Sequence, residues 1–202
     1  MGQYYFPIIL GDLSHRKMLK KELIRAWLSP FAYNNGQKLM EHSYFMNPLL
    51  LAFEYLISPE GPFYMSRVVW AGEYADNEPD LQKNLHNIAQ DNESSKMIRP
   101  DPSSTVYRYI INHTKNLYID KNAGWSPIHP LPLLLAEGNG RGGGDYRGDD
   151  EILCGTWSRD IISVDHSYPR DFSEFFCKFA DQYNPLPNTT SIRSSDDLMY
   201  GS

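Results

Sequence analysis

The spacing of apolar residues predicts a strand and then a helix in the first part of the chain. Tyr4–Leu10 is a run of aromatic and branched apolar residues, typical of a strand, in which Pro7 favours an edge position or a bulge. Over residues 47–57 the apolar side chains recur on one helical face. Asn47 and Pro48 precede them, in the order expected of a helix N-cap and a first-turn proline.

Residues 15–28 fit two patterns. Three apolar residues recur at helical spacing: Leu19, Leu23 and Trp27. Three others alternate as they would in a strand: Ile24, Ala26 and Leu28. The lysine and glutamate content favours the helix, which we prefer, and the strand stays open.

The remaining apolar runs predict short elements that come mostly in strand pairs. In chain order they are a strand over 67–71, a helix over 81–88, a hairpin of 106–111 with 117–119, a strand over 131–136, a hairpin of 152–157 with 161–164, and a helix over 172–179. Paired strands argue against a doubly wound parallel sheet. We therefore predict an α+β fold, with a mostly antiparallel sheet of about six strands and three or four helices. It would form a single domain over 1–183, followed by a flexible tail over 184–202.

Composition and charge narrow the function classes. The chain has 202 residues, is 41% hydrophobic and carries a net charge of −6, so it can form a core but lacks the basic excess of nucleic-acid-binding proteins. No apolar run reaches the roughly 20 residues that a membrane-spanning helix needs. The two cysteines, Cys154 and Cys177, do not make a disulfide framework, and the N-terminus lacks a signal-peptide pattern. We expect a cytoplasmic protein that binds neither nucleic acid nor membrane, with its oligomeric state open.

A glycine-rich segment is the most unusual feature of the chain, since six of its 14 glycines lie between Gly138 and Gly148. Part of it matches the spacing of the dinucleotide-binding fingerprint, but that motif needs a helix directly after the glycines, and here acidic residues follow. We therefore expect no nicotinamide or flavin cofactor. Two interpretations stay open, a backbone nest that binds an anion and a long hairpin connection that its acids keep solvated. As a ligand site, the segment would contribute Gly140, Arg141, Gly142, Gly143, Gly144 and Asp145.

Candidate catalytic groups lie outside this segment. His42 would need a distant acid, because its sequence neighbours point in other directions; the alternative is a turn residue with a satisfied imidazole. Glu73 and Asp76 come directly after a predicted buried strand, where carboxylates are placed for acid–base chemistry, or they cap the next element of the chain. Asp160 is a candidate ligand-binding residue or half of an ion pair with the arginine beside it. The six histidines show no metal-ligand spacing, so we expect no metal site.

Several segments without a local explanation carry a resemblance. They are Met1-Gly-Gln-Tyr-Tyr5, Lys38-Leu-Met-Glu-His-Ser43, Arg67-Val-Val-Trp-Ala-Gly-Glu-Tyr-Ala-Asp76, Ile111-Asn-His-Thr-Lys115 and Glu137-Gly-Asn-Gly-Arg-Gly-Gly-Gly-Asp-Tyr146. Together they resemble a family of uncharacterised proteins from bacteria and their phages, over most of residues 1–165. The resemblance implies no activity, cofactor or partner, so no functional residue is carried over from it.

The clustering of these polar groups at predicted strand ends suggests a function. We expect a small polar ligand, a nucleotide or sugar phosphate, in a cleft beside the glycine-rich segment, with carboxylate-assisted hydrolysis as the reaction if the protein is an enzyme. The alternative is a non-enzymatic interaction protein, an inhibitor or accessory factor that binds another protein through exposed aromatic side chains. The 14 tyrosines support this alternative.

Overall fold

A computed structural model describes residues 2–11, 23–91, 96–123, 125, 127–138 and 154–175. Within these residues the strands are β1 (Tyr5–Leu10), β2 (Ile24–Trp27), β3 (Ser66–Gly72), β4 (Tyr109–Asn112), β5 (Leu117–Asp120), β6 (Ala136–Glu137), β7 (Ile161–Asp165) and β8 (Ser173–Glu174). The helices are η1, a 3-10 turn (Pro30–Tyr33), α1 (Leu39–His42), α2 (Pro48–Leu56), α3 (Leu85–Asp91) and α5 (Pro130–Leu135). The predicted α+β class is confirmed.

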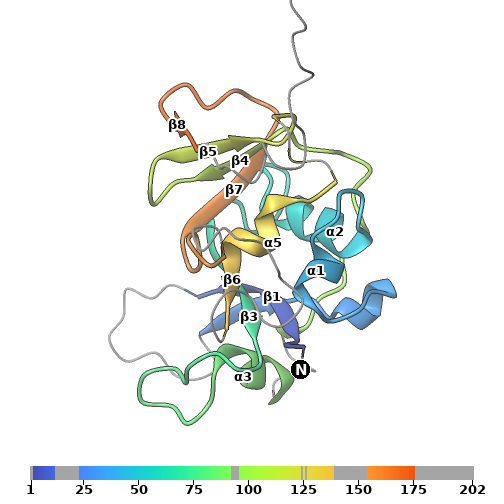
Figure 1. Ribbon diagram of the computed structural model, residues 1–202, viewed down its shortest axis with the longest axis vertical. Coiled ribbons are helices and arrows are strands. Elements are labelled where there is room, and N and C mark those ends of the chain that lie inside the picture. The colour runs from blue at the N-terminus through green and yellow to red at the C-terminus, as the bar shows by residue number, and fades with distance from the viewer. Residues whose placement is uncertain are drawn as a thin grey trace, which may run out of the picture.

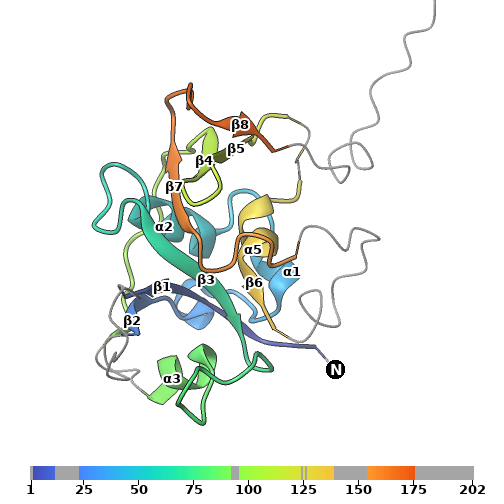
Figure 2. The same cartoon turned by 90° about the vertical axis from the view of Figure 1, so that its left-hand side faces the viewer.

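The eight strands form one mixed, mostly antiparallel sheet, in which seven follow the order β2-β1-β3-β7-β4-β5-β8 and the eighth, β6, pairs with β3 off this path. The long strand β3 connects its two halves, since it pairs with β1 along one side and with β7 and β6 along the other. The pairing of β6 with β3 is parallel, as is that of β8 with β5. Figures 1 and 2 show β3 running from the β4–β5–β7 half to the β1–β2 half.

Two hydrophobic cores pack on opposite faces of β3. Val68 and Trp70 belong to the larger core with α2 and α5, whereas Val69 and Ala71 belong to a smaller core with α3. Successive side chains of a strand alternate between faces, so a strand covered on both sides is apolar throughout. In Figure 2, α3 accordingly lies on one side of β1 and β3, with α1, α2 and α5 on the other.

The helix predicted over 47–57 is confirmed as α2, and its start is explained by the sequence. The Asn47 side chain accepts hydrogen bonds from the backbone N–H groups of Leu49 (2.9 Å) and Leu50 (3.4 Å), and Pro48 occupies the first helical position. The strand expected over 67–71 is confirmed as β3, and the hairpin expected from 106–111 with 117–119 is confirmed as β4 and β5.

Pro7 does not mark an edge strand, because β1 lies between β2 and β3. The Pro7 carbonyl accepts from the backbone N–H of Leu28 (3.1 Å), just past the end of β2. The Pro7 nitrogen faces β2 as well, at the point where the pairing of β1 with β2 ends. The N–H that proline lacks therefore costs the sheet little. The irregularity in this strand lies instead between Ile9 and Leu10, where the register shifts.

Five other predictions need correction. Residues 24–27 form strand β2 rather than a helix, since Ile24 and Trp27 pack in the smaller core and Ala26 in the larger. Residues 130–135 form helix α5 rather than a strand, and only β6 is extended. Residues 154–159 are turns rather than the first strand of a hairpin. The helix of 81–88 begins only at Leu85, and the segment predicted as a helix over 172–179 carries strand β8 in its described part.

Candidate functional site

The loop after β3 and the glycine-rich segment leave the sheet side by side. Because β3 and β6 are parallel, with Trp70 opposite Ala136 and Ala71 opposite Glu137, their carboxyl ends meet at one edge. The start of β1 lies at the same edge, since it runs antiparallel to β3. The described acids of this edge are Glu73, Asp76, Glu78 and Glu137. We name this place the β3–β6 edge.

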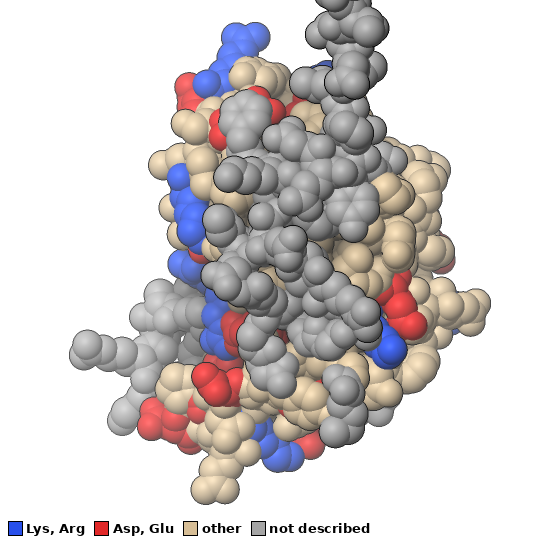
Figure 3. All heavy atoms as spheres, viewed as in Figure 1, with Lys and Arg blue, Asp and Glu red and all other residues tan. Residues whose placement is uncertain are grey.

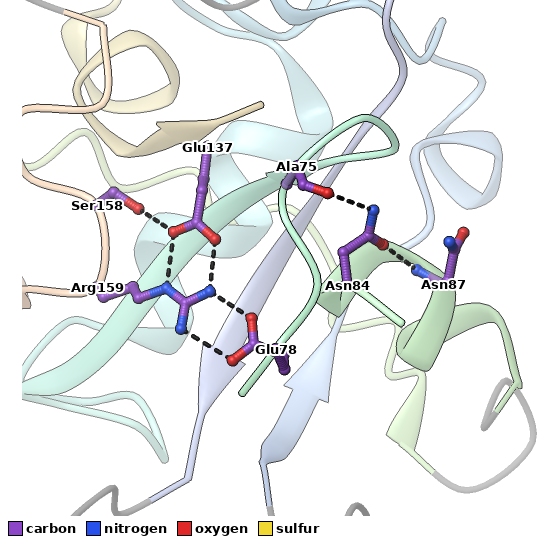
Figure 4. Close-up of polar contacts among 7 residues, drawn as sticks. All are labelled: Ala75, Glu78, Asn84, Asn87, Glu137, Ser158 and Arg159. Carbon is purple, nitrogen blue, oxygen red and sulfur yellow. Dashed lines mark hydrogen bonds and ion pairs between the residues drawn. The ribbon is translucent and has the colours of Figure 1, made fainter. Parts of the chain in front are cut away.

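One arginine joins two of these acids. Arg159 binds Glu137 through Nε (2.7 Å) and Nη2 (2.5 Å), and it binds Glu78 through Nη1 (3.0 Å) and Nη2 (2.5 Å) (Figure 4). The Ser158 hydroxyl also donates to Glu137, at 2.9 Å. Burial raises the pKa of the Glu137 carboxyl, but the Arg159 bonds outweigh it, so the pKa lies below its usual value. The cluster therefore holds three distant segments together at the β3–β6 edge.

Replacing Arg159 with methionine is expected to lower the free energy of unfolding by about 2 kcal/mol. The change leaves Glu78, whose side chain is only 5% exposed, without its cation. Urea unfolding followed by tryptophan fluorescence measures the effect. Arg108→Met is the matched control, because that arginine pairs with Asp120 but is half exposed, and it should change stability little. Equal losses of unfolding free energy in the two variants would show that the Arg159 cluster stabilises the fold no more than an exposed ion pair does.

His42 is a fully buried residue of the larger core. Its Nδ1 accepts a hydrogen bond from Trp70 Nε1 (2.9 Å), and its Nε2 lies 2.8 Å from the Gly36 carbonyl oxygen. The Trp70 N–H can only donate, so the neutral ring carries its proton on Nε2 and donates it to Gly36. Burial lowers the pKa of His42 to about 4. Both ring nitrogens are therefore used within the fold.

The two candidate carboxylates of the β3–β6 edge differ in their surroundings. Glu73 is half-buried, and its Oε1 accepts from the backbone N–H of Tyr4 at 3.4 Å. Asp76 is exposed, in the loop after the turn at residues 73–74. His42 does not belong with them, because its ring nitrogens bind Trp70 and Gly36. The structure thus places Glu73 at the β3–β6 edge, just past the end of β3, and places His42 in the buried interior.

Asp160 lies on the other side of Arg159 and faces the β4–β5 hairpin. Its carboxylate accepts from Asn112 Nδ2 (2.8 Å) and pairs with the Lys115 ammonium group. It is mostly buried, and its backbone pairs with Val68. Asp160 is therefore tied to β4 and β7 rather than directed at Glu73.

Gly138 is the one residue of the glycine-rich segment that the structure describes. The candidates Gly140, Arg141, Gly142, Gly143, Gly144 and Asp145 lie outside the described residues, as do Cys177 and the 184–202 tail. A β-carbon on Gly138 would lie 2.4 Å from Gln3 Nε2, and one on Gly72 would lie 2.5 Å from it, so the Gln3 amide covers both strand ends. Gln3 Oε1 accepts from the Tyr5 hydroxyl (2.7 Å), and among the described residues its buried Nε2 has no hydrogen-bond partner.

The structure contains a buried ionic cluster that the sequence analysis did not predict. Lys121 Nζ lies 2.5 Å from Glu54 Oε1, and His129 Nε2 lies 3.0 Å from the same oxygen. All three side chains are 2% exposed. The one signal in the sequence was Glu54 itself, the single charge in the otherwise uncharged α2 sequence. Because Glu54 has two partners and almost no exposure, the cluster joins α2, the chain after β5 and the start of α5.

Comparisons with known proteins add no functional assignment, because the chain matches no protein-family model, and the comparisons with curated proteins and with solved structures found no match. Among the described residues, no group of three or more His, Cys, Asp or Glu side chains is arranged to hold a metal ion. No helix in the described ranges has the length and apolar character needed to cross a bilayer.

Proposed function

We propose that the chain binds a small polar ligand at the β3–β6 edge. The observation that carries the proposal is the parallel pairing of β3 with β6, which brings Glu73 and the start of the glycine-rich segment to one place. Ligand sites tend to lie where loops leave the carboxyl ends of strands on a rigid scaffold. We also propose that the protein is cytoplasmic, as expected from the sequence.

The charge of this edge favours an uncharged or cationic ligand over a phosphate. Four carboxylates are contributed by Glu73, Asp76, Glu78 and Glu137. The guanidinium of Arg159 is already bound by two of them, so it has little capacity left for an anion. A neutral sugar or nucleoside therefore suits the edge better than its phosphorylated form.

Within this proposal, Glu73 is the carboxylate that would act in hydrolysis. Glu78 and Glu137 are each held by Arg159, and both nitrogens of His42 are occupied. Glu73 accepts a long hydrogen bond from the Tyr4 N–H and is also a hydrogen-bond partner of the Tyr74 side chain, but its carboxylate has further lone pairs that can accept a proton or a ligand hydroxyl.

A thermal-shift screen tests the proposal with glucose, adenosine, their monophosphates, Mg²⁺ and Ca²⁺. We expect a neutral compound to raise the unfolding temperature by several degrees at about 100 times its Kd, since that occupancy stabilises by about 2.7 kcal/mol. Glu73→Gln should abolish the shift. Asp165→Asn, at the far end of β7, is the control and should retain it. If no compound stabilises the chain, the ligand-binding proposal is wrong.

A protein-interaction role is the second candidate, and a specific surface favours it. Phe31 is 68% exposed, Met46 62% exposed and Tyr44 47% exposed. Their segments are joined by the Asn35–Asn47 hydrogen bond (3.2 Å). On the face in Figure 3 the side that lies over α1 and α2 is mostly uncharged. Aromatic and methionine side chains are enriched at protein interfaces, so this surface suits a protein partner.

A further inference from the structure

His86 in α3 is a buried histidine whose polar atoms are not used by the fold. Its ring is 2% exposed and stacks on Phe6, with ring centroids 4.2 Å apart and planes within 6°. Within the described part of the chain, neither Nδ1 nor Nε2 of His86 has a hydrogen-bond partner. Buried polar groups in native proteins are nearly always paired, so an unpaired imidazole calls for a partner that the chain alone does not supply.

Phenylalanine would fill the same place at lower cost if packing were the only role. His42 has the same burial, but both of its nitrogens are bonded. At His86 the buried ring nitrogens carry a desolvation penalty that no hydrogen bond of normal geometry offsets, although the Asn87 side chain lies near enough to raise the pKa of the ring. The contrast between the two histidines indicates that His86 has a role beyond packing.

The position of His86 beside Glu73 is fixed by Asn84. Asn84 Nδ2 donates to the backbone carbonyls of Glu73 (2.9 Å) and Ala75 (3.0 Å), and its Oδ1 accepts from the Asn87 N–H (2.9 Å) (Figure 4). This fastens the start of α3 to the turn that carries Glu73. Glu73 itself lies in that turn, just past the end of β3 at Gly72, and it is close enough to His86 for its charge to raise the pKa of the ring.

We propose that His86, rather than His42, is the imidazole of the ligand site at the β3–β6 edge, where it offers one donor and one acceptor to a hydroxyl or amide group of an uncharged ligand. The proposal rests on the ligand-binding function proposed above and adds a residue and a ligand class to it. Burial keeps the ring neutral by lowering its pKa, against the opposing effects of Glu73 and of the Asn87 side chain. A neutral imidazole is the form that can both donate and accept.

Calorimetric titration of glucose and adenosine into three proteins tests the role of His86. We expect His86→Phe, which keeps the stacking on Phe6, to bind the better of these two probes about tenfold more weakly than the wild type. His86→Gln, which keeps a donor and an acceptor, should retain part of the lost affinity. Equal affinity in all three proteins would overturn the role of His86 and leave the proposed function standing. Failure of the wild type to bind either probe would instead count against the proposed function and the inference together.

A second measurement follows the His86 ring without any ligand. NMR titration of the imidazole nitrogens gives the pKa of His86 in the wild type and in Glu73→Gln. We expect a lower pKa in Glu73→Gln, because Glu73 is the charged residue that raises it. An unchanged pKa would show that the carboxylate and the imidazole do not face one another, and it would overturn the assignment of both to one site.

Discussion

Replacing Glu54 with glutamine is expected to lower the free energy of unfolding by about 3–5 kcal/mol, a larger loss than that expected for Arg159→Met. Lys121 and Glu54 are both 2% exposed, and their charges compensate one another at 2.5 Å. Without the carboxylate, the Lys121 ammonium group stays buried beside an uncharged amide and must either desolvate alone or lose its proton. Urea unfolding at pH 7 measures the loss.

The double variant Glu54→Gln with Lys121→Met separates charge from packing. It removes the unpaired cation, while the new amide oxygen can still accept from His129 Nε2, which lies 3.0 Å from Glu54 Oε1. Buried ion pairs are often replaceable by uncharged side chains of similar size at little cost, so the double variant should regain most of the lost stability. A double variant no more stable than the single one would show that the loss comes from shape rather than from the unpaired charge.

The fold was predictable where local signals and tertiary packing agree. Asn47 and Pro48 indicate α2 because an N-cap and a first-turn proline act within one helical turn. The α5 helix was mistaken for a strand because all of its residues, Pro130–Leu135, are buried, so its apolar run has no polar face to reveal a helical period. The His129 side chain, which accepts from the Leu131 N–H, was the local sign of a helix start.

The β2 strand was mistaken for a helix for a related reason. Ile24 and Trp27 pack in one core and Ala26 in the other, so burial on both faces leaves a pattern that fits either period. The neighbouring lysines and glutamate favoured the helix, but their helix propensity carries no information about the pairing with β1. Tertiary pairing decides such a segment, and local propensity is a weak guide to it.

The candidate site was predictable in location more than in its contacts. Glu73 lies just after a buried strand, and the structure does place it beside the start of the glycine-rich segment, since β3 and β6 are parallel. The partners of Arg159 were not predictable, because Glu78 lies 81 positions away in the chain. The partners of the His42 nitrogens, Trp70 and Gly36, were not predictable either, since a histidine's neighbours in sequence do not tell which groups its nitrogens will meet.

Acid is expected to destabilise the fold before most carboxylates titrate, and His42 is one reason. Its pKa is about 4 in the fold, against about 6.5 in an unfolded chain, so below pH 6.5 the unfolded state binds a proton that the native state does not. This histidine alone should cost about 2 kcal/mol by pH 5 and about 3 kcal/mol near pH 4. Burial lowers the pKa of His129, His86 and His113 as well, so their contributions have the same sign.

Urea unfolding of the wild type and of His42→Gln from pH 7.5 to 4.5 measures this dependence. At pH 7.5 the variant should be less stable than the wild type, because the hydrogen bond from Trp70 Nε1 loses an acceptor of fixed geometry. Below pH 6.5 its stability should fall less steeply, since one of the groups that gains a proton on unfolding is gone. Parallel curves for the two proteins would mean that His42 takes up its proton equally in both states, which requires its ring to be open to water or its bond with Trp70 to be absent.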